Sequence, residues 1–117
     1  RIVYLGERND IADLMSHADA FCLPSLWEGL PVTLLEALSV GCIPICSPVG
    51  GIVNVIESGK NGLLSKDSSE SEYFITVNSF LNMTDEERVS MKEEALKSFA
   101  KYDIKNCANQ YLKVYSE

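Results

Sequence analysis

Short apolar runs recur along the first 66 residues, and their spacing restricts the folds that this chain can adopt. The runs are IVYL, AFCL, IPIC and GLLS, at residues 2–5, 20–23, 43–46 and 62–65. None alternates apolar with polar residues, and continuous apolar runs are typical of strands buried on both faces of a parallel sheet. The segments between them have helical spacing, so the alternation predicts an α/β fold with right-handed crossovers.

Capping and stop signals support the helices between these runs. Asp10 precedes the segment 11–18, and Asp13 occupies the capping-box position, so we expect Asp10 to cap that helix. Pro31 suits the first turn of the next helix, and Gly41 suits the position just past its end. The chain therefore alternates strand and helix in a βαβαβαβ pattern.

The chain changes character after residue 66, where three further helices are predicted. A polar stretch leads into a helix that runs to about Met83, and Thr84 with Glu87 forms a capping box for a second helix. Asp103 precedes a third helix, whose apolar residues share one face. We expect these helices to cover the sheet or to contact a neighbouring domain.

This organisation predicts a single partial domain over residues 1–117, with a Rossmann-like parallel sheet and C-terminal helices. Residues 1–66 would form the core, with about four strands, and residues 67–117 would form the C-terminal helical segment. The sequence starts at Arg1 and enters the first apolar run at once. We therefore expect these residues to be part of a longer protein.

The composition argues against several classes of function. A net charge of -7 disfavours nucleic-acid binding, which needs a basic face. No apolar run approaches the roughly 18 residues that cross a membrane. The four cysteines and the single histidine lack the spacing of metal ligands, so we expect no metal site. We expect the thiols to be reduced and mostly buried in strands, which suits a cytoplasmic protein.

The stretch WEGLPVTLLEALSVG, residues 27–41, is the strongest candidate for a binding site. It follows the strand 20–23 and enters a helix, and ligands of open α/β sheets bind beyond the carboxyl ends of the strands. Free amides at a helix start suit a phosphate, and the carboxylates of Glu28 and Glu36 can accept hydrogen bonds from sugar hydroxyls. The alternative is an ordinary loop followed by a helix with one glutamate at its polar edge.

Several motifs in register point to one family. Seven residues separate Glu28 from Glu36 in EGLPVTLLE, with VYLGERNDIADLMSHADAFCLPS before them and ALSVGCIPICSPVGG and VIESGKNGLL after them. This order resembles the C-terminal nucleotide-sugar-binding domain of retaining GT-B glycosyltransferases of group 1, or family 4. The resemblance is close over residues 1–66 and looser through the C-terminal helices. An unrelated Rossmann-like domain is the alternative.

The resemblance implies roles for individual residues around this E-x7-E motif. Glu36 matches the acid that accepts hydrogen bonds from the ribose hydroxyls of the nucleotide. Glu28 matches the catalytic-site acid that lies at the donor sugar and helps to position it. Gly29 and Leu30 match the loop whose backbone lines the sugar, and Pro31 opens the donor-binding helix.

The remaining implied contacts concern the diphosphate and the base. Val32 and Thr33 match the helix start that contacts the diphosphate. The loop of Gly6, Glu7 and Arg8 matches a border of the base pocket, which is the weakest of these correspondences. The resemblance implies no metal and no cofactor besides the donor itself, a nucleotide-diphosphate sugar of the UDP or GDP type. Asn54 departs from the family, which usually has glutamate there, and we expect only a local effect on the loop.

The resemblance also implies partners and an activity. The family transfers sugar to acceptors such as polysaccharides or glycolipids, and its diphosphate-binding Arg and Lys side chains and its acceptor domain would lie upstream of residue 1. We therefore expect this chain alone to be inactive and its partners to be a nucleotide sugar and the missing N-terminal domain. A cytoplasmic protein, peripheral at the inner face of the membrane, is expected. The alternatives are a non-catalytic GT-B-like nucleotide-sugar-binding module and a sugar-nucleotide epimerase, the latter disfavoured by the E-x7-E motif.

The family's strand order, 3-2-1-4-5-6, has a consequence for this chain. Residues 2–5 would be strand 3, and the two strands between them and residues 20–23 would be missing. An exposed edge at residues 20–24 would follow, which favours dimerisation or aggregation. We expect residues 2–5 either to pair beside residues 20–23 or to complete a sheet in a partner chain.

Overall fold

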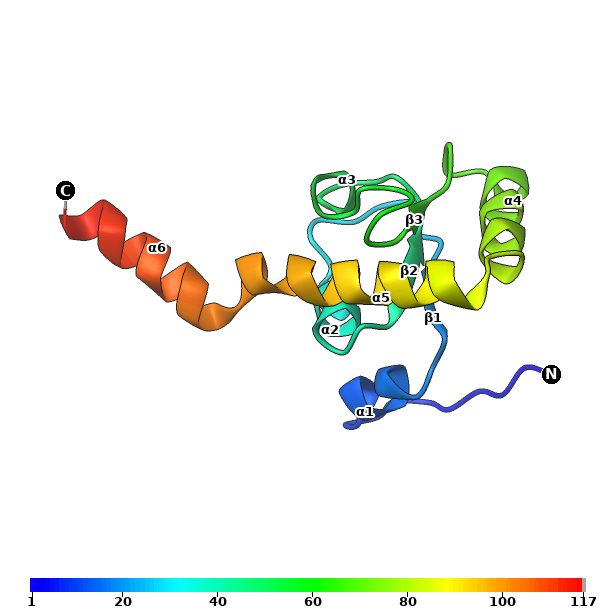
Figure 1. The fold of residues 1–117 in the computed structure, drawn as a ribbon, viewed down its shortest axis with the longest axis horizontal. Helices are drawn as coiled ribbons and strands as arrows, with labels where there is room; N and C mark the ends of the chain where they lie inside the picture. Colours follow the sequence, from blue (N-terminus) through cyan, green and yellow to red (C-terminus); the bar gives the residue numbers. More distant parts are fainter. Residues whose placement is uncertain (117) are drawn as a thin grey trace.

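The protein is an α/β structure built on a small parallel sheet (Figure 1). The computed structural model describes residues 1–116, apart from the side chain of Ile104. The sheet has the order β1-β2-β3, and its strands are β1 (Ala20–Leu23), β2 (Ile43–Cys46) and β3 (Leu63–Leu64). In the register, Ala20 pairs with Ile43 and Ile45 pairs with Leu63. The predicted α/β class and parallel sheet are confirmed, with three strands instead of about four.

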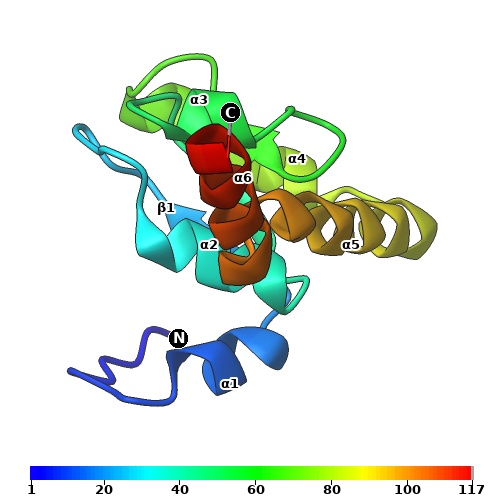
Figure 2. The same cartoon turned by 90° about the vertical axis from the view of Figure 1, so that its left-hand side faces the viewer.

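Residues 2–5 do not form the predicted strand. They run as an extended segment beside α1 (Ile11–Ser16), away from the sheet, and Ile2 and Tyr4 are 100% and 94% exposed (Figures 1 and 2). The predicted pairing of these residues with β1 is therefore wrong. An apolar strand is stable only where neighbouring elements cover both of its faces. A strand paired beside β1 would lack such cover, because no described helix lies over the outer edge of β1. Within the described residues, β1 pairs with β2 alone and its outer edge is unpaired.

Helices cover both faces of β2, whose four residues are all buried. Ile43 and Ile45 pack against Phe80 of α4 (Glu70–Leu81) and Met91 of α5 (Asp85–Phe99). Cys46 belongs to a second cluster that is formed with α2 (Val32–Ser39), α3 (Ile52–Val55) and the later part of α5. This burial explains why the IPIC run has no polar position.

The first helix starts without the cap that its sequence predicts. The Asp10 side chain makes no capping hydrogen bond, because both of its oxygens accept hydrogen bonds from the Arg8 guanidinium at 2.7 Å. This contact lowers the pKa of the Asp10 carboxyl. A bidentate hydrogen bond between a guanidinium and a carboxylate is strong and geometrically specific, so the Arg8 contact replaces the expected capping of α1 by Asp10.

The caps of the later helices agree better with the sequence. Ser69 accepts a hydrogen bond from the Glu72 amide at the start of α4. Thr84 and Glu87 form the predicted capping box of α5. A short 3-10 helix, η1 (Ala100–Tyr102), leads into α6 (Ile104–Ser116), which projects from the body of the protein (Figures 1 and 2). None of the described helices combines the length and the apolar character needed to span a bilayer.

The four cysteines are free thiols in different environments. Burial raises the pKa of Cys42 to about 11 and that of Cys46 to about 12. Cys22, in contrast, is exposed on the edge strand β1, so the expectation that the strand cysteines are buried is wrong there. Within β1 it is the one exposed position, whereas Ala20, Phe21 and Leu23 are half-buried.

Candidate functional site

The loop between β1 and α2 carries Glu28 at the carboxyl end of the sheet. Glu28 is half-buried, and its carboxylate accepts a hydrogen bond of 2.7 Å from the Ser25 hydroxyl. The carbonyl of Ser25 in turn accepts a hydrogen bond of 2.5 Å from the hydroxyl of Ser47, which directly follows β2. The Ser47 amide also donates to the carbonyl of Leu23 at 3.1 Å. These hydrogen bonds fix the loop after β1 against the loop after β2.

Two glycines bring these loops into direct backbone contact. The Gly51 amide donates to the Gly29 carbonyl at 2.6 Å. Gly50 has a φ of +55°, and a methyl group added there would lie 1.8 Å from the Glu28 carbonyl oxygen. Only glycine can adopt this conformation at such a short distance without displacing the neighbouring backbone. Gly50 and Gly51 therefore set the path of the chain that carries Glu28.

The start of α2 presents free amides to solvent. Pro31 is the N-cap residue and no side chain caps the helix, while Val32 and Thr33 are exposed in the first turn. A methyl group added at Gly29, next to this turn, would meet no atom within 4 Å, so the space in front of it is open. Free amides and the positive end of the helix dipole make such a terminus suitable for a phosphate.

Glu36 lies near the middle of α2, among the residues that hold the helix on the sheet. Its neighbours Ala37 and Leu38 are fully buried, whereas Glu36 itself is half-buried. Within residues 1–116, its carboxylate has neither a hydrogen-bond nor an ion-pair partner. The apolar pattern around it suggests a buried carboxylate, but the side chain reaches solvent and remains free to accept hydrogen bonds from a ligand.

The predicted base-pocket residues are not brought to this site. Gly6, Glu7 and Arg8 are exposed on the segment that leads to α1, and the Arg8 side chain is paired with Asp10. Among the described residues, no hydrogen bond or ion pair joins them to the loop of Glu28 or to Glu36. The structure thus brings together Glu28 to Thr33 and places Glu36 on the same helix, but it leaves residues 6–8 apart.

Sequence reasoning missed the residues that position the loop. Ser25 and Ser47 each stand next to a proline directly after a strand, in Pro24-Ser25 and Ser47-Pro48, and this repeated pattern was the available signal. Trp27, in the same loop, is 89% exposed.

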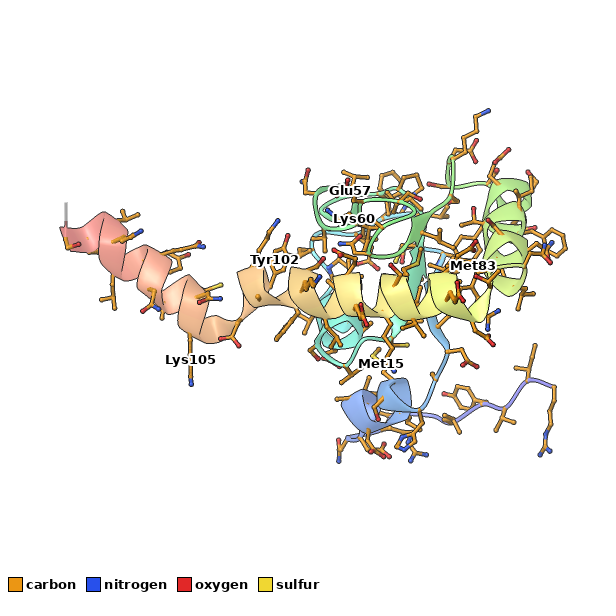
Figure 3. All side chains as sticks on the ribbon, viewed as in Figure 1. Met15, Glu57, Lys60, Met83, Tyr102 and Lys105 are labelled. Carbon is orange, nitrogen blue, oxygen red and sulfur yellow. The ribbon has the colours of Figure 1, made fainter. Side chains whose placement is uncertain are left out.

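Other polar groups near the sheet serve structural contacts. Lys60 forms an ion pair with Glu57 at 3.7 Å in the loop that follows α3 (Figure 3).

A cavity of about 500 Å³, with a mostly apolar lining, borders the loop after β1 on the side of α4 and includes Leu26 and Phe74. In the described part of the chain, no group of three His, Cys, Asp or Glu side chains is arranged to hold a metal ion.

The chain is similar to known glycosyltransferases. The family model of glycosyl transferases group 1 matches residues 1–98. An N,N'-diacetylbacillosaminyl-diphospho-undecaprenol alpha-1,3-N-acetylgalactosaminyltransferase of Campylobacter jejuni is 34% identical over 96% of this chain and 30% of its own length. A UDP-Gal:alpha-D-GlcNAc-diphosphoundecaprenol alpha-1,3-galactosyltransferase of Escherichia coli is 31% identical over 94% of this chain and 25% of its own length. The chain thus spans less than a third of either relative.

Solved structures show the same fold. HepE of Anabaena, in complex with UDP-glucose, superposes with a TM-score of 0.85 at 22% identity, over 99% of this chain and 32% of HepE. The C-terminal domain of LpcC, a glycosyl transferase group 1 protein of Francisella tularensis, gives 0.70 at 19% identity, over 86% of this chain and 51% of that one. These structural neighbours are GT-B glycosyltransferases. With the family model matching most of its length, the chain belongs to the glycosyl transferases group 1 family.

Proposed function

We propose that this chain forms the nucleotide-diphosphate-sugar-binding portion of a retaining glycosyltransferase, which transfers a sugar to a polysaccharide or glycolipid acceptor. The observation that carries the proposal is the contact of Gly50 and Gly51 with the loop of Glu28, which holds that loop beside an open helix start. Crystal structures of HepE contain UDP-glucose or UDP, which supports a donor of the UDP type.

Each residue of the site has a role in this proposal. The free carboxylate of Glu36 accepts hydrogen bonds from the ribose hydroxyls, and the amides of Val32 and Thr33 bind the diphosphate. Glu28, oriented by Ser25, contacts the donor sugar and positions it for transfer. Gly29 and Leu30 line the sugar with backbone, and Pro31 fixes the start of the helix. The helix dipole stabilises the negative charge that develops on the departing diphosphate.

The acceptor and the remaining catalytic groups belong to a longer protein in this proposal. The chain spans 30% and 25% of the two bacterial relatives, so most of such an enzyme would lie outside it. The names of both relatives specify sugars carried on undecaprenol diphosphate, a lipid. In this proposal a lipid-linked acceptor brings the enzyme to the cytoplasmic face of a membrane, in contact with its surface.

Nucleotide titration of the full-length protein tests the binding role. We expect UDP to bind more tightly than GDP or ADP in calorimetry, and Glu36→Gln to weaken UDP about tenfold or more, because hydrogen bonds to a charged group contribute about 1.5–3 kcal/mol. Glu93→Gln, an exposed change on α5, is the matched control and should leave the affinity unchanged. If Glu36→Gln and Glu93→Gln bind UDP with equal affinity, the contact of Glu36 with the ribose is contradicted.

Turnover separates the transferase from a binding module. Incubation of the full-length protein with a UDP-sugar and a lipid-linked glycan should give a product with the anomeric configuration of the donor, detected by NMR. A product of opposite configuration would contradict retention. Tight UDP binding without turnover on any lipid-linked or polysaccharide acceptor would favour the non-catalytic module.

A further inference from the structure

A buried serine after β2 holds the loop that carries Glu28. Ser47 is 2% exposed, and its hydroxyl donates a hydrogen bond of 2.5 Å to the Ser25 carbonyl. Its amide donates to the Leu23 carbonyl at 3.1 Å. Both donors of Ser47 therefore bind the backbone that leads from β1 to Glu28.

The side chain of Ser25 extends this connection to the carboxylate itself. Its hydroxyl donates to Oε1 of Glu28 at 2.7 Å, and both residues are half-buried. Hydrogen bonds are directional, so this contact limits rotation of the carboxylate and gives its second oxygen, Oε2, a defined direction. Because the acceptor is charged, the hydrogen bond is about twice as strong as a neutral one. Ser47 thus fixes the backbone of Ser25, and the Ser25 hydroxyl fixes Glu28.

Ser65 occupies the equivalent position after β3. It is 3% exposed, and its amide donates to the Cys46 carbonyl at 3.0 Å, as the Ser47 amide does to Leu23. Its hydroxyl, however, donates to the Asp67 carbonyl at 2.7 Å, within its own loop. The two buried serines have the same backbone role and differ in the group that the hydroxyl holds. Ser65 is therefore a matched control for Ser47.

We propose that Ser25 and Ser47 are positioning residues for the donor sugar, which act through Glu28 and not through the nucleotide. The inference rests on the proposed function, because it requires Glu28 to lie at the sugar. The two hydroxyls hold the carboxylate so that Oε2 accepts a hydrogen bond from a sugar hydroxyl in a fixed direction. Glu36 and the free amides of α2 belong to a helix that is packed on the sheet. Loss of either serine hydroxyl should therefore leave nucleotide binding intact.

Kinetics and titration of the full-length protein test this inference, with UDP-glucose and UDP-galactose as donors and UDP alone as the nucleotide probe. We expect Ser25→Ala to lower kcat/KM for the UDP-sugar about tenfold or more, because it removes a hydrogen bond to a charged group. Ser47→Ala should lower it severalfold, since a small displacement of the loop misplaces Glu28. The affinity for UDP should stay unchanged in both variants. Ser25→Thr retains the hydroxyl and should recover most of the lost kcat/KM.

Ser65→Ala and the double variant separate positioning from a general loss of stability. Ser65→Ala should lower stability in urea unfolding about as much as Ser47→Ala does, yet leave kcat/KM unchanged. The variant that combines Ser25→Ala with Ser47→Ala should resemble Ser25→Ala, because residues that act on one shared partner have non-additive effects.

Two outcomes would overturn the inference alone. If Ser47→Ala and Ser65→Ala transfer sugar equally well, the Ser47 hydroxyl does not act on Glu28. If Ser25→Ala and Ser47→Ala lower the affinity for UDP as much as they lower kcat/KM, the serines support the whole site and not the sugar contact. Failure of the proposed function is distinguishable from both, because the wild type itself would then bind neither UDP nor the UDP-sugars, and both proposals would be refuted.

Discussion

Gly50 offers the sharpest test of how the site is held in place. Gly50→Ala forces an L-residue into a φ of +55° and places a methyl group 1.8 Å from the Glu28 carbonyl oxygen. Contacts of Cβ atoms below about 3.0 Å essentially do not occur, so one loop must move by more than about 1 Å. The substitution therefore separates the two loops that meet at the site.

The expected magnitude has two parts. The left-handed conformation costs an alanine roughly 1–2 kcal/mol relative to glycine. Forcing a methyl group into packed backbone costs roughly 1–3 kcal/mol more. Together these two costs should lower the free energy of unfolding of Gly50→Ala by about 2–5 kcal/mol. The displaced loop should also reduce sugar transfer about 100-fold, because a misplacement of about 1 Å at a reacting group has an effect of that size.

Urea unfolding, UDP titration and a sugar-transfer assay of Gly50→Ala and Gly59→Ala in the full-length protein measure these effects. Gly59 has a φ of +88°, yet a methyl group added there meets no atom within 4 Å. It therefore reports the conformational cost alone, with an expected loss of about 1–2 kcal/mol and unchanged UDP affinity. If Gly50→Ala is no more destabilising than Gly59→Ala and binds UDP normally, the loops do not depend on each other and the reasoning fails.

Three further predictions concern the fold. Thr84→Ala should destabilise the protein by about 1 kcal/mol in urea unfolding, since it removes the side-chain acceptor that caps α5. Asn61→Asp should cost about 3 kcal/mol, because its buried amide group donates to the Val55 carbonyl and to a serine hydroxyl of α5. At pH 8, Cys42 and Cys46 should react with Ellman's reagent far more slowly than the other two cysteines, with thiolate fractions of about 0.1% and 0.01%.

Controls make these three predictions specific. Thr84→Ser keeps the capping hydroxyl and should retain wild-type stability, so an equal loss for the serine and alanine variants would contradict the cap. Ser98→Ala removes one of the two acceptors of the Asn61 amide and should cost about 1 kcal/mol. If Asn61→Asp costs less than about 1 kcal/mol, the proposed role of Asn61 in joining the Val55 carbonyl to Ser98 is contradicted. The reactivity of the buried thiols should rise about tenfold per pH unit below their pKa values, and equal rates for all four cysteines would refute the burial argument.

Local signals in the sequence predict much of this fold. The capping box of Thr84 and Glu87 identifies the start of α5 correctly, because both halves of that interaction lie within four residues. The IPIC run identifies β2, whose apolar positions all find cover. Asp10 shows the limit of such signals. Its carboxylate has two available partners, and the side chain of Arg8, not the helix amide, binds it.

Features that depend on distant neighbours are predicted less well. Residues 2–5 have the apolar pattern of a buried strand. Such a pattern shows that the strand must be buried to be stable, but it does not show whether a partner strand is present. The exposure of Cys22 is equally hard to predict, since nothing within four residues reveals that this position of β1 remains uncovered. The E-x7-E motif predicts where the candidate site lies. The serines after the strands and the approach of Gly50 to Glu28 are long-range contacts that spacing alone does not predict.

The contact between Gly29 and Gly51 also determines when the site can form during folding. Gly29 follows β1 and Gly51 follows β2, the two strands that α2 connects, so the loop takes its shape only after both strands have paired. Closing a loop of about twenty residues carries an entropic cost that the strand pairing must first offset. A peptide containing Glu28 to Glu36 alone would lack this support. Transplanting the site to another scaffold therefore requires the whole unit, from Ala20 to Gly51.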